Sequence, residues 1–376
     1  MKIVVAPDSF KGTIRAARVA EIIADQFRRV LPGIKIVELP LADGGEGTLE
    51  AVSSALGMET VEAEVQGPLG EPIRARYGLN RTKRKALIES ARACGMSLVP
   101  PDKRNPLKLS SAGVGDLIRT ALDRGAEEMI VSLGGSATVD GGLGMAKALG
   151  YRLLDSQERD IPEGGGGLLY LHRIDSSRVD PRLAGCRFRI AADVDNPLYG
   201  PNGAAPVFGP QKGADPAMAA VLDRGLQNLM HLMLSQELLK TEAPGDGAAG
   251  GLGAALRAFC RGEIESGAEW VCRSVNLDEQ LHGAHLLITG EGKVDEQTLR
   301  GKLCQIASRH ARNQKVPVLL LCGILELGTE IDGIADFAFS CGRGLSSASL
   351  SMESAEADLA RCALSCARLI NRFFRD

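Results

Sequence analysis

Short apolar runs separated by amphipathic stretches dominate both ends of the chain. Residues 2–6 (KIVVA) predict a buried strand, and the apolar positions of residues 19–30 recur at the spacing of a helix, which Thr13 can cap. Gly33 ends this helix, and residues 34–39 (IKIVEL) predict a second strand. A strand–helix–strand order of this kind is typical of a parallel sheet covered by helices.

The carboxyl-terminal part of the chain repeats this alternation of strands and helices. The segments expected there are strands that open residues 285–292 (HLLITGEG) and lie within 316–323 (VPVLLLCG) and 336–342 (DFAFSCG), and helices over 298–312 and 355–373. Because the two ends are alike, we expect them to form one sheet, with the middle of the chain inserted between them.

The middle of the chain follows a different pattern. Residues 61–79 alternate between apolar and polar positions around a Gly-Pro turn, which predicts a β-hairpin. Residues 114–122 predict a helix, and residues 127–133 (EEMIVSL) predict a buried strand that leads into a glycine-rich loop and a further helix. The glycine run at 164–167 is expected to be a plain surface loop.

Composition narrows the class of protein. The chain has 376 residues, enough for two domains, with 44% hydrophobic and 24% charged residues, as in ordinary globular proteins. The net charge of −3 provides no basic field for a nucleic acid, and no apolar run is long enough to span a membrane. Nine cysteines without a C-x-x-C spacing indicate reduced thiols in a cytoplasmic protein, rather than disulfides or a zinc site.

Five loops of similar make-up follow predicted strands. They are APDSFKG (6–12), PLADGGEG (40–47), LGGSATVDGG (133–142), DVDNP (193–197) and TGEGKVD (289–295). Ligands of parallel α/β sheets collect beyond the carboxyl ends of the strands. Glycine N–H groups suit phosphate oxygens, and carboxylates suit Mg²⁺ and proton abstraction, so the five loops together indicate phosphoryl transfer. Taken singly, each loop also fits a plain turn whose aspartate caps the backbone.

Two further features point to anion binding. Lys11 lies just before a predicted helix start, where a cation is disfavoured by about 0.3–1 kcal/mol. It either grips an anion there or is a solvated lysine that tolerates this cost. Residues 104–118 (RNPLKLSSAGVGDLI) bring Ser110 and Ser111 to another helix start, either to receive phosphate or carboxylate oxygens or only to cap the helix.

Other nucleotide-binding signatures are missing from the sequence. The chain has no G-x-x-x-x-G-K-[ST] loop and no protein-kinase motif set. The G-x-G-x-x-G at Gly245–Gly250 follows a helical-looking stretch and not a strand, so we reject it as a dinucleotide fingerprint.

Taken together, the motifs resemble those of the type I glycerate kinase family. The resemblance rests on APDSFKG, ADGGEGT, LGGSATVDGG, DVDNPLYGPNGAAPVFGPQKGA, GAAGGLG and ITGEGKVDEQTLRGK, which run in order from Met1 to about Lys302. The chain departs from the family pattern at Val139, Ala192 and Leu41, where the family often has Asn, Cys and Met. These positions neighbour the polar ones, and only Val139 removes a potential polar contact.

The resemblance implies an ATP-dependent kinase that phosphorylates D-glycerate with Mg²⁺, more often to 2-phosphoglycerate than to 3-phosphoglycerate. It implies an α/β fold with two domains and the active site in the cleft between them. A discontinuous Rossmann-like parallel-sheet domain would comprise residues 1–60 plus 284–376, and a mixed α/β domain, residues 61–283, would be inserted in it. The expected partners are glycerate and ATP, without nucleic acid or membrane, in a monomer or homodimer.

Glycerate phosphorylation assigns expected roles to the polar residues of these loops. The catalytic candidates are Asp193, Asp195 and Lys11, and it stays open which aspartate is the base and which binds metal. The substrate-binding candidates are Asp8, Ser9, Arg104, Ser110, Ser111 and Asn196. The nucleotide-binding candidates are Gly134, Gly135, Ser136, Thr138 and Glu291. The metal-binding candidates are Asp43, Glu46, Asp140 and Asp295, where Asp140 alternatively holds its loop.

Two other interpretations of the sequence stay open. A kinase could act on a related small hydroxy acid, and a non-catalytic sugar-acid sensor could use the same anion-binding loops without ATP. A sensor would need no spare carboxylates for metal and base, and this chain has many.

Overall fold

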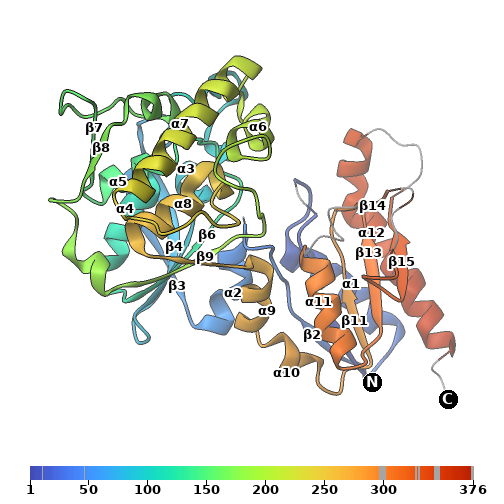
Figure 1. Cartoon of the computed structure of the whole chain (residues 1–376). Helices are drawn as coiled ribbons and strands as arrows, with labels where there is room; N and C mark the ends of the chain where they lie inside the picture. Colours follow the sequence, from blue (N-terminus) through green and yellow to red (C-terminus); the bar gives the residue numbers. More distant parts are fainter. Residues whose placement is uncertain are drawn as a thin grey trace. The chain divides into compact units, whose positions relative to one another are not determined.

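The protein is a mixed α/β chain that divides into two compact units (Figure 1). The computed structural model describes residues 1–10, 12–45, 47–295, 302–326, 328, 331–342 and 348–373. Unit 1 comprises Met1–Asp43, Glu50–Leu56 and Ala268–Asp376, and unit 2 comprises Gly44–Leu49 and Gly57–Gly267. The boundaries proposed from the sequence, at 60/61 and 283/284, lie C-terminal to the changes of unit at 56/57 and 267/268.

Unit 1 contains a five-stranded sheet among its described residues, in the order β15-β13-β11-β1-β2. Its strands are β1 (Lys2–Val5), β2 (Lys35–Glu38), β11 (Leu286–Thr289), β13 (Val318–Cys322) and β15 (Phe337–Ser340). All the pairings are parallel, so the two ends of the chain form one sheet, as the sequence predicted. If these five strands are renumbered 1 to 5 in chain order, their order across the sheet is 2-1-3-4-5. The strand order reverses between β1 and β11, which makes this the topological switch point.

Helices pack against the strands of this unit. They are α1 (Ala16–Val30), α2 (Thr48–Leu56), α9 (Gly267–Ser274), α10 (Leu277–Leu281), α11 (Leu303–Asn313) and α12 (Ala348–Phe373), and the short pair β12 (Lys293–Val294) and β14 (Ile324–Leu325) completes the unit. Ile3 and Val5, which share one face of β1, pack in a common core with Phe27 of α1 and Leu359 of α12. The alternate side chain, Val4, is also fully buried, so β1 has no solvent-facing side.

Two helix starts differ from the prediction. The first helix begins at Ala16, after an extended Arg15 that makes no side-chain cap bond, so Thr13 is not its cap. The helix expected over 298–312 begins at Leu303, because Lys302 is extended with φ −68° and ψ 164°. The first residues of that prediction lie outside the described part of the chain.

Unit 2 is built on a six-stranded mixed sheet in the order β10-β9-β6-β5-β4-β3. Its strands are β3 (Glu59–Gln66), β4 (Pro72–Asn80), β5 (Lys85–Glu89), β6 (Glu128–Ser132), β9 (Arg187–Ala191) and β10 (Glu263–Glu265), with β7 (Arg152–Leu154) and β8 (Arg173–Asp175) as a separate antiparallel pair. β5, β6, β9 and β10 run parallel, so their carboxyl ends share one edge. β3 and β4 form the predicted antiparallel hairpin.

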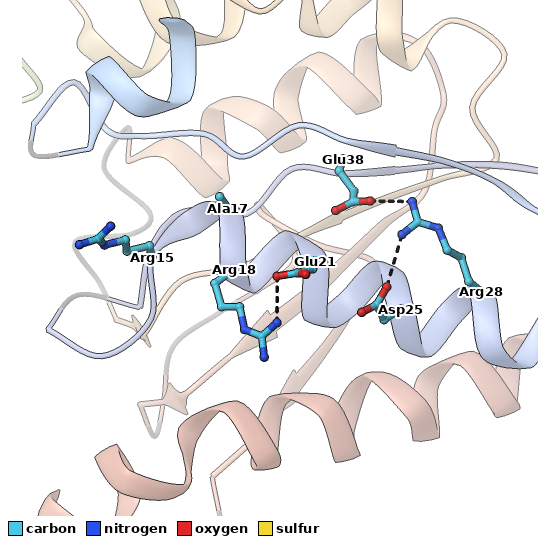
Figure 2. Close-up of a pocket in the computed structure, with 7 residues that line it drawn as sticks. All are labelled: Arg15, Ala17, Arg18, Glu21, Asp25, Arg28 and Glu38. Atoms are coloured by element: carbon cyan, nitrogen blue, oxygen red, sulfur yellow. Dashed lines mark hydrogen bonds and ion pairs between the residues drawn. The ribbon is translucent and has the colours of Figure 1, made fainter. Parts of the chain in front are cut away.

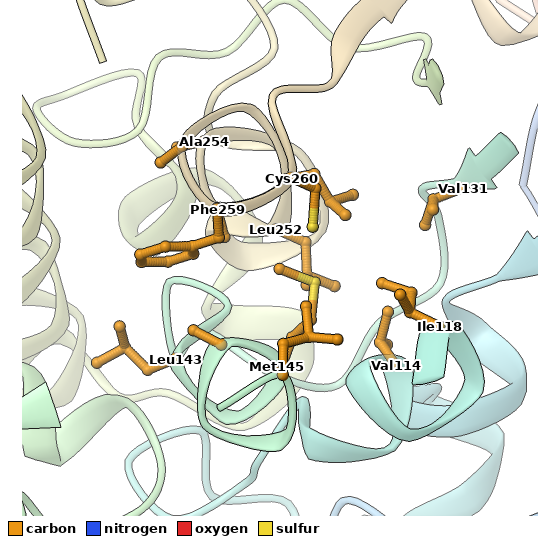
Figure 3. Close-up of a cluster of buried hydrophobic side chains, with 14 of the residues drawn as sticks. Val114, Ile118, Val131, Leu143, Met145, Leu252, Ala254, Phe259 and Cys260 are labelled. Carbon is orange, nitrogen blue, oxygen red and sulfur yellow. The ribbon is translucent and has the colours of Figure 1, made fainter. Parts of the chain in front are cut away.

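Helices on this sheet enclose the largest apolar core of unit 2 (Figure 3). They are α3 (Ala91–Cys94), α4 (Ala112–Asp123), α5 (Leu143–Ala148), α6 (Ala204–Phe208), α7 (Pro216–Ser235) and α8 (Ala248–Cys260), with 3-10 turns η1 (Met96–Leu98), η2 (Pro101–Lys103), η3 (Gly165–Tyr170), η4 (Pro181–Gly185) and η5 (Pro210–Lys212). Val114 of α4, Met145 of α5 and Leu252 of α8 meet in this core. The helices that follow the glycine-rich loops are thereby fixed on the sheet.

The glycine run at 164–167 is not the plain surface loop that the sequence predicted. It opens the 3-10 turn η3, and Gly165 and Gly167 are buried. A Cβ on Gly165 would clash with Leu222 of α7 and with the Val139 carbonyl. These glycines therefore allow a helix and a neighbouring backbone to approach closely.

No helix in the described part of the chain combines the length and the apolar character that crossing a membrane requires.

Candidate active site

The loop after β6 presents backbone N–H groups that the fold does not use. This loop comprises residues 133–142. Its first part is fixed on both sides by hydrogen bonds, from the N–H of Leu133 to β9 (2.9 Å) and from the N–H of Ala137 to α3 (2.8 Å). Between them, no described residue accepts the N–H groups of Gly134, Gly135 and Ser136. Gly135 is exposed and left-handed at φ 63°. Consecutive free N–H groups around a left-handed residue form a concave site for an anion.

Asp140 holds the second part of this loop, which leads into α5. Its buried carboxylate accepts four hydrogen bonds, from the Ser111 N–H (2.9 Å) and hydroxyl (2.8 Å) and from the N–H groups of Gly142 and Gly144 (3.1 Å each). Burial raises the pKa of Asp140, and these hydrogen bonds oppose the rise. The side chain is fully buried and both its oxygens are engaged, which favours the loop-holding alternative over metal binding.

A second glycine-rich segment, in α8, packs against the same loop. In α8, Gly250 and Gly251 have φ of 74° and 98°, which interrupts the helix with a kink. The Gly250 carbonyl accepts the N–H of Gly141 at 3.0 Å, and a Cβ on Gly250 would clash with the Thr138 carbonyl. The G-x-G-x-x-G pattern thus serves backbone packing, and it follows no strand, in agreement with its rejection as a dinucleotide fingerprint.

Lys212 supplies a buried cation to the loop, and sequence reasoning missed it. Its ammonium donates to the Ser136 hydroxyl at 3.0 Å and to the Thr138 carbonyl at 2.9 Å. The residue is 3% exposed, and burial lowers its pKa from 10.5 to about 8. Within the sequence it looked like an ordinary loop lysine between glycines, with no local signal of its burial.

Arg104 lies close to the exposed tip of this loop. Its guanidinium donates to the Met96 carbonyl at 3.5 Å, and the Met96 N–H donates to the Gly135 carbonyl at 2.8 Å. The side chain is half-buried. An arginine held near unused N–H groups fits a site for a carboxylate or phosphate.

Ser110 and Ser111 support the fold beneath the loop. They are 1% and 0% exposed. The Ser110 hydroxyl accepts the N–H of Ala112 at 3.3 Å, and the Ser111 hydroxyl lies between Asp140 and the N–H of Met145. Both hydroxyls thus have partners within the fold, although Ser111 makes no side-chain cap bond at the start of α4 and its hydroxyl accepts from α5 instead.

The aspartates after β9 differ in how they are held. Asp193 and Asp195 are both exposed, and the Ser266 hydroxyl donates to Asp193 at 2.9 Å. No described residue makes a hydrogen bond or ion pair with Asp195. Asn196 uses its side-chain amide to bind the Asn202 carbonyl at 2.8 Å, within its own loop. Asp193 is therefore the better positioned of the two aspartates.

Unit 2 brings part of the ADGGEGT segment to the same sheet edge. A Cβ on Gly134 would lie 2.9 Å from the Gly45 Cα, and a Cβ on Gly44 would lie 3.6 Å from the Asp193 carboxylate. The glycines at these positions allow two backbones to approach closely. Residues from three predicted loops thus meet at the carboxyl ends of β6 and β9.

Glu89 is a further buried carboxylate at this edge, and sequence reasoning missed it. It ends β5, is 1% exposed, and accepts the Leu49 N–H at 3.0 Å and the Arg92 guanidinium at 2.6 Å. A carboxylate after a buried strand was the signal used for the other loops, so the sequence contained the clue. Beside it, the hydroxyls of Ser90 and Ser132 are buried without a hydrogen-bond partner among the described residues.

Unit 1 gathers a different set of candidates at its own switch point. Asp8, Asp43 and Glu291 line a small cavity with Lys302 and Cys304. Asp8 follows β1 and Glu291 follows β11, the two strands between which the strand order reverses. Burial, then Glu291 and Asp8, hold the pKa of the Cys304 thiol well above its usual value. The cavity is a carboxylate-rich site with one ammonium group.

The remaining candidates of unit 1 lie around this cavity. Asp295 is 3.6 Å from the Lys302 ammonium and 3.5 Å from that of Lys293. The Ser9 N–H donates to the Asp8 carboxylate at 2.6 Å. Lys302 therefore bridges the cavity and Asp295.

Two candidates, Lys11 and Glu46, lie outside the described residues. The expectation for Lys11 rested on a helix start directly after it, and α1 begins only at Ala16.

The carboxylates fit a hard cation without forming a cage. Among the described residues, no group of three or more His, Cys, Asp or Glu side chains has the arrangement of a metal site. Mg²⁺ usually takes only one or two carboxylates and completes its shell with water and substrate phosphates. Asp8, Asp43 and Glu291 offer oxygen ligands of that kind in one cavity.

A hollow along the outside of α1 contains no candidate residue (Figure 2). Its charges are of both signs and largely pair, for example Arg28 with Glu38 at 2.6 Å and Arg18 with Glu21 at 2.8 Å. These side chains are about half exposed, so solvent screens the ion pairs and they add little to stability. With three arginines and three carboxylates, the hollow has no net charge to attract an ion.

Comparisons with known proteins identify the family of the chain. The model of the "Glycerate kinase family" matches residues 3–371. The chain is 46% identical over 326 residues to the "Glycerate 2-kinase" of Escherichia coli K12, covering 86% of each protein. It is 46% identical over 327 residues to the "Glycerate kinase" of Bacillus subtilis 168, covering 86% of this chain and 85% of that one.

A solved structure supports the fold over the whole chain. The crystal structure of "putative glycerate kinase 2" from Salmonella typhimurium LT2 covers 100% of both chains at a TM-score of 0.85 and 43% identity. Sequence, fold and family model agree: the chain belongs to the glycerate kinase family and is an enzyme, a kinase that transfers a phosphoryl group to an alcohol group.

Proposed function

We propose that the protein transfers the γ-phosphoryl group of ATP to the 2-hydroxyl of D-glycerate with Mg²⁺, which gives 2-phosphoglycerate. The observation that carries the phosphoryl-transfer part is the loop after β6, with three consecutive unused N–H groups at Gly134, Gly135 and Ser136. The name of the Escherichia coli relative, "Glycerate 2-kinase", supports the 2-position.

The loop after β6 is the proposed phosphate site. Its N–H groups donate to phosphate oxygens without any change in the fold, because no other acceptor must be displaced. Lys212 and Asp140 hold the loop in this shape before the ligand arrives. A site that is already formed loses less entropy when it binds.

Glycerate adds a carboxylate and two hydroxyl groups to be positioned. Arg104 is the proposed carboxylate ligand, since its guanidinium is half-buried near Gly135. Asp193 is the proposed general base, because Ser266 holds its carboxylate while it stays exposed. A carboxylate that accepts the hydroxyl proton speeds such a step by about 10²–10⁴-fold.

Asp8, Asp43 and Glu291 are the proposed carboxylates for Mg²⁺. Mg²⁺ held there would supply the charge neutralisation that phosphoryl transfer requires.

The proposal is tested by ADP release with D-glycerate, L-glycerate and glycolate as separate acceptors. We expect release only with D-glycerate, and only while Mg²⁺ is present. ADP release that persists in EDTA, or that ignores the acceptor, rejects the proposal. Faster release with glycolate identifies a related hydroxy acid as the substrate instead.

The product is identified with enolase and without a phosphoglycerate mutase. Enolase converts 2-phosphoglycerate to phosphoenolpyruvate directly but does not act on 3-phosphoglycerate. Phosphoenolpyruvate should therefore accumulate without the mutase. If it forms only after mutase is added, the product is 3-phosphoglycerate and the 2-position is wrong.

A further inference from the structure

Lys212 is a buried cation that none of the proposed chemical roles uses. Its residue is 3% exposed, so the surrounding protein shields its ammonium from solvent. Burying an ammonium group is costly unless its surroundings compensate for the lost water. Two hydrogen bonds compensate here, to the Ser136 hydroxyl and the Thr138 carbonyl. Both acceptors belong to the loop that carries the unused N–H groups.

The direction of one hydrogen bond matters for Ser136. An ammonium group has only donors, so Lys212 occupies a lone pair of the Ser136 oxygen. The hydroxyl proton must then point away from Lys212. No described residue accepts this proton. The Ser136 hydroxyl can therefore donate its proton to a ligand, and it belongs to the residue that follows Gly134 and Gly135 in the loop.

We propose that Lys212 is a positioning residue of the phosphate site, which acts through Ser136: its ammonium turns the Ser136 hydroxyl into a donor to the bound phosphate and holds the Thr138 carbonyl out of the site. This inference rests on the proposed function of the loop. A donor that is itself bonded to a cation is polarised and donates more strongly. A negative ligand also gains from the positive charge behind the loop.

The charge of Lys212 is sensitive to pH near neutrality. Burial lowers its pKa to about 8, while Cys94 and Asp140, the titratable groups that face it, raise it. Burial also raises the pKa of Cys94 to about 12, so this thiol stays neutral in the range of the experiment. Loss of a proton from Asp140 on raising the pH would favour the ammonium. A loss of ligand affinity above pH 8 is therefore the signature of Lys212 itself.

The experiment measures the Kd for ADP by calorimetry, together with KM and kcat for glycerate phosphorylation. Lys212→Met removes the charge and keeps most of the side-chain volume. Removing a charge-assisted hydrogen bond should raise the Kd for ADP about 10-fold to 100-fold. The KM for glycerate should change much less. Lys83→Met is the matched control. Lys83 is exposed in the turn before β5, and this turn leads into the end of β5 that lies opposite to its carboxyl end at Glu89.

Three further variants test whether Lys212 acts through Ser136. Ser136→Ala should raise the Kd for ADP, and the double variant should be little worse than Lys212→Met alone, because both changes remove the same contact. Lys212→Arg, which keeps the charge, should recover part of the affinity. Additive effects of Lys212→Met and Ser136→Ala would overturn the proposal.

The pH profile supplies a readout that a purely structural lysine would not move. One pH unit above a pKa of about 8, only about a tenth of Lys212 stays charged, so the Kd of the parent should rise about tenfold. The terminal phosphate, with a pKa of about 6, is ionised throughout this range. Lys212→Met should lack this rise, and Ser136→Ala should show a smaller rise than the parent, because it keeps the charge of Lys212 but not the hydroxyl.

The outcomes separate this inference from the function on which it rests. If the parent neither binds ADP nor phosphorylates glycerate, the proposed function fails. If the parent is active and folded Lys212→Met binds ADP within about twofold of it, only the role of Lys212 fails. Should Lys212→Met not fold, the pH profiles of the parent and Ser136→Ala decide, and a flat parent profile overturns the proposal.

Discussion

Replacing Asp140 by alanine should remove the support of the loop after β6. Three buried backbone N–H groups, those of Ser111, Gly142 and Gly144, would lose their acceptor. The fourth donor, the Ser111 hydroxyl, can rotate and still accept the N–H of Met145. Each buried N–H left without a partner costs about 1–3 kcal/mol, so the loss in stability is at least about 3 kcal/mol.

Asn at position 140 should cost less than Ala. Its amide oxygen can keep the bonds from Ser111 and Gly144, and its NH₂ group would face the N–H of Gly142 and lose that bond. One orphaned buried donor predicts a loss of about 1–3 kcal/mol. Alanine should therefore be the more destabilising of the two replacements.

Thermal and urea unfolding, followed by circular dichroism, measure these losses. At about 2–4 °C per kcal/mol for a unit of this size, Asp140→Ala should lower the Tm by about 6–12 °C. Asp102→Ala is the control, because Asp102 is exposed and no described residue bonds to its carboxylate. A loss below about 1 kcal/mol for Asp140→Ala would contradict the reasoning. A stable Asp140→Ala variant that needs much more Mg²⁺ for activity would instead restore the metal role.

Two other predictions concern the site and the buried charge. Asp193→Asn should fold normally and lower kcat by about 10²-fold or more. Asp195→Asn should have a smaller effect on kcat. Partial recovery of kcat in Asp193→Asn with added Mg²⁺ would make Asp193 a metal ligand and not the base. Because the folded-state pKa of Lys212 is below its unfolded value, the parent carries a penalty at low pH that disappears as the pH rises from about 8 to 10.5. The stability of the parent relative to Lys212→Met, measured by urea unfolding, should therefore rise by about 3 kcal/mol over this window, and a constant difference would refute the buried ammonium.

Periodicity predicted the sheets well because burial leaves a local signature. β1 is buried on both faces and appears as a continuous apolar run, whereas β3 and β4 alternate because the hairpin has exposed positions. Packing between distant segments leaves no such signature. The glycines of η3 looked like a loop because the helix that they admit, α7, begins far along the chain at Pro216.

The candidate site was predicted only as far as composition and strand order allow. Glycines and carboxylates after strands pointed to five loops, of which three meet in unit 2, while carboxylates of three line one cavity in unit 1. The same residue types serve a ligand and a fold, however, and only burial separates the two uses. Asp193 is exposed, whereas Asp140 is surrounded by backbone donors. Lys212 had no signal, because nothing in its neighbouring residues distinguishes a buried ammonium from a solvated one.

Buried charge in this loop has a physical rationale that apolar packing cannot replace. Asp140 collects N–H groups that point inward, and Lys212 collects a hydroxyl and a carbonyl oxygen. With these polar groups bonded inside, the N–H groups of Gly134 to Ser136 are the ones left for a ligand. An apolar side chain at position 140 or 212 could fill the volume but would leave the polar groups now bonded to Asp140 or Lys212 without partners. The backbone would then change shape to pair these groups, and the N–H groups that the site needs would be used in doing so. Asp140 thus stabilises the fold of this loop, Lys212 carries a penalty for its burial, and together they maintain a backbone shape that can receive an anion.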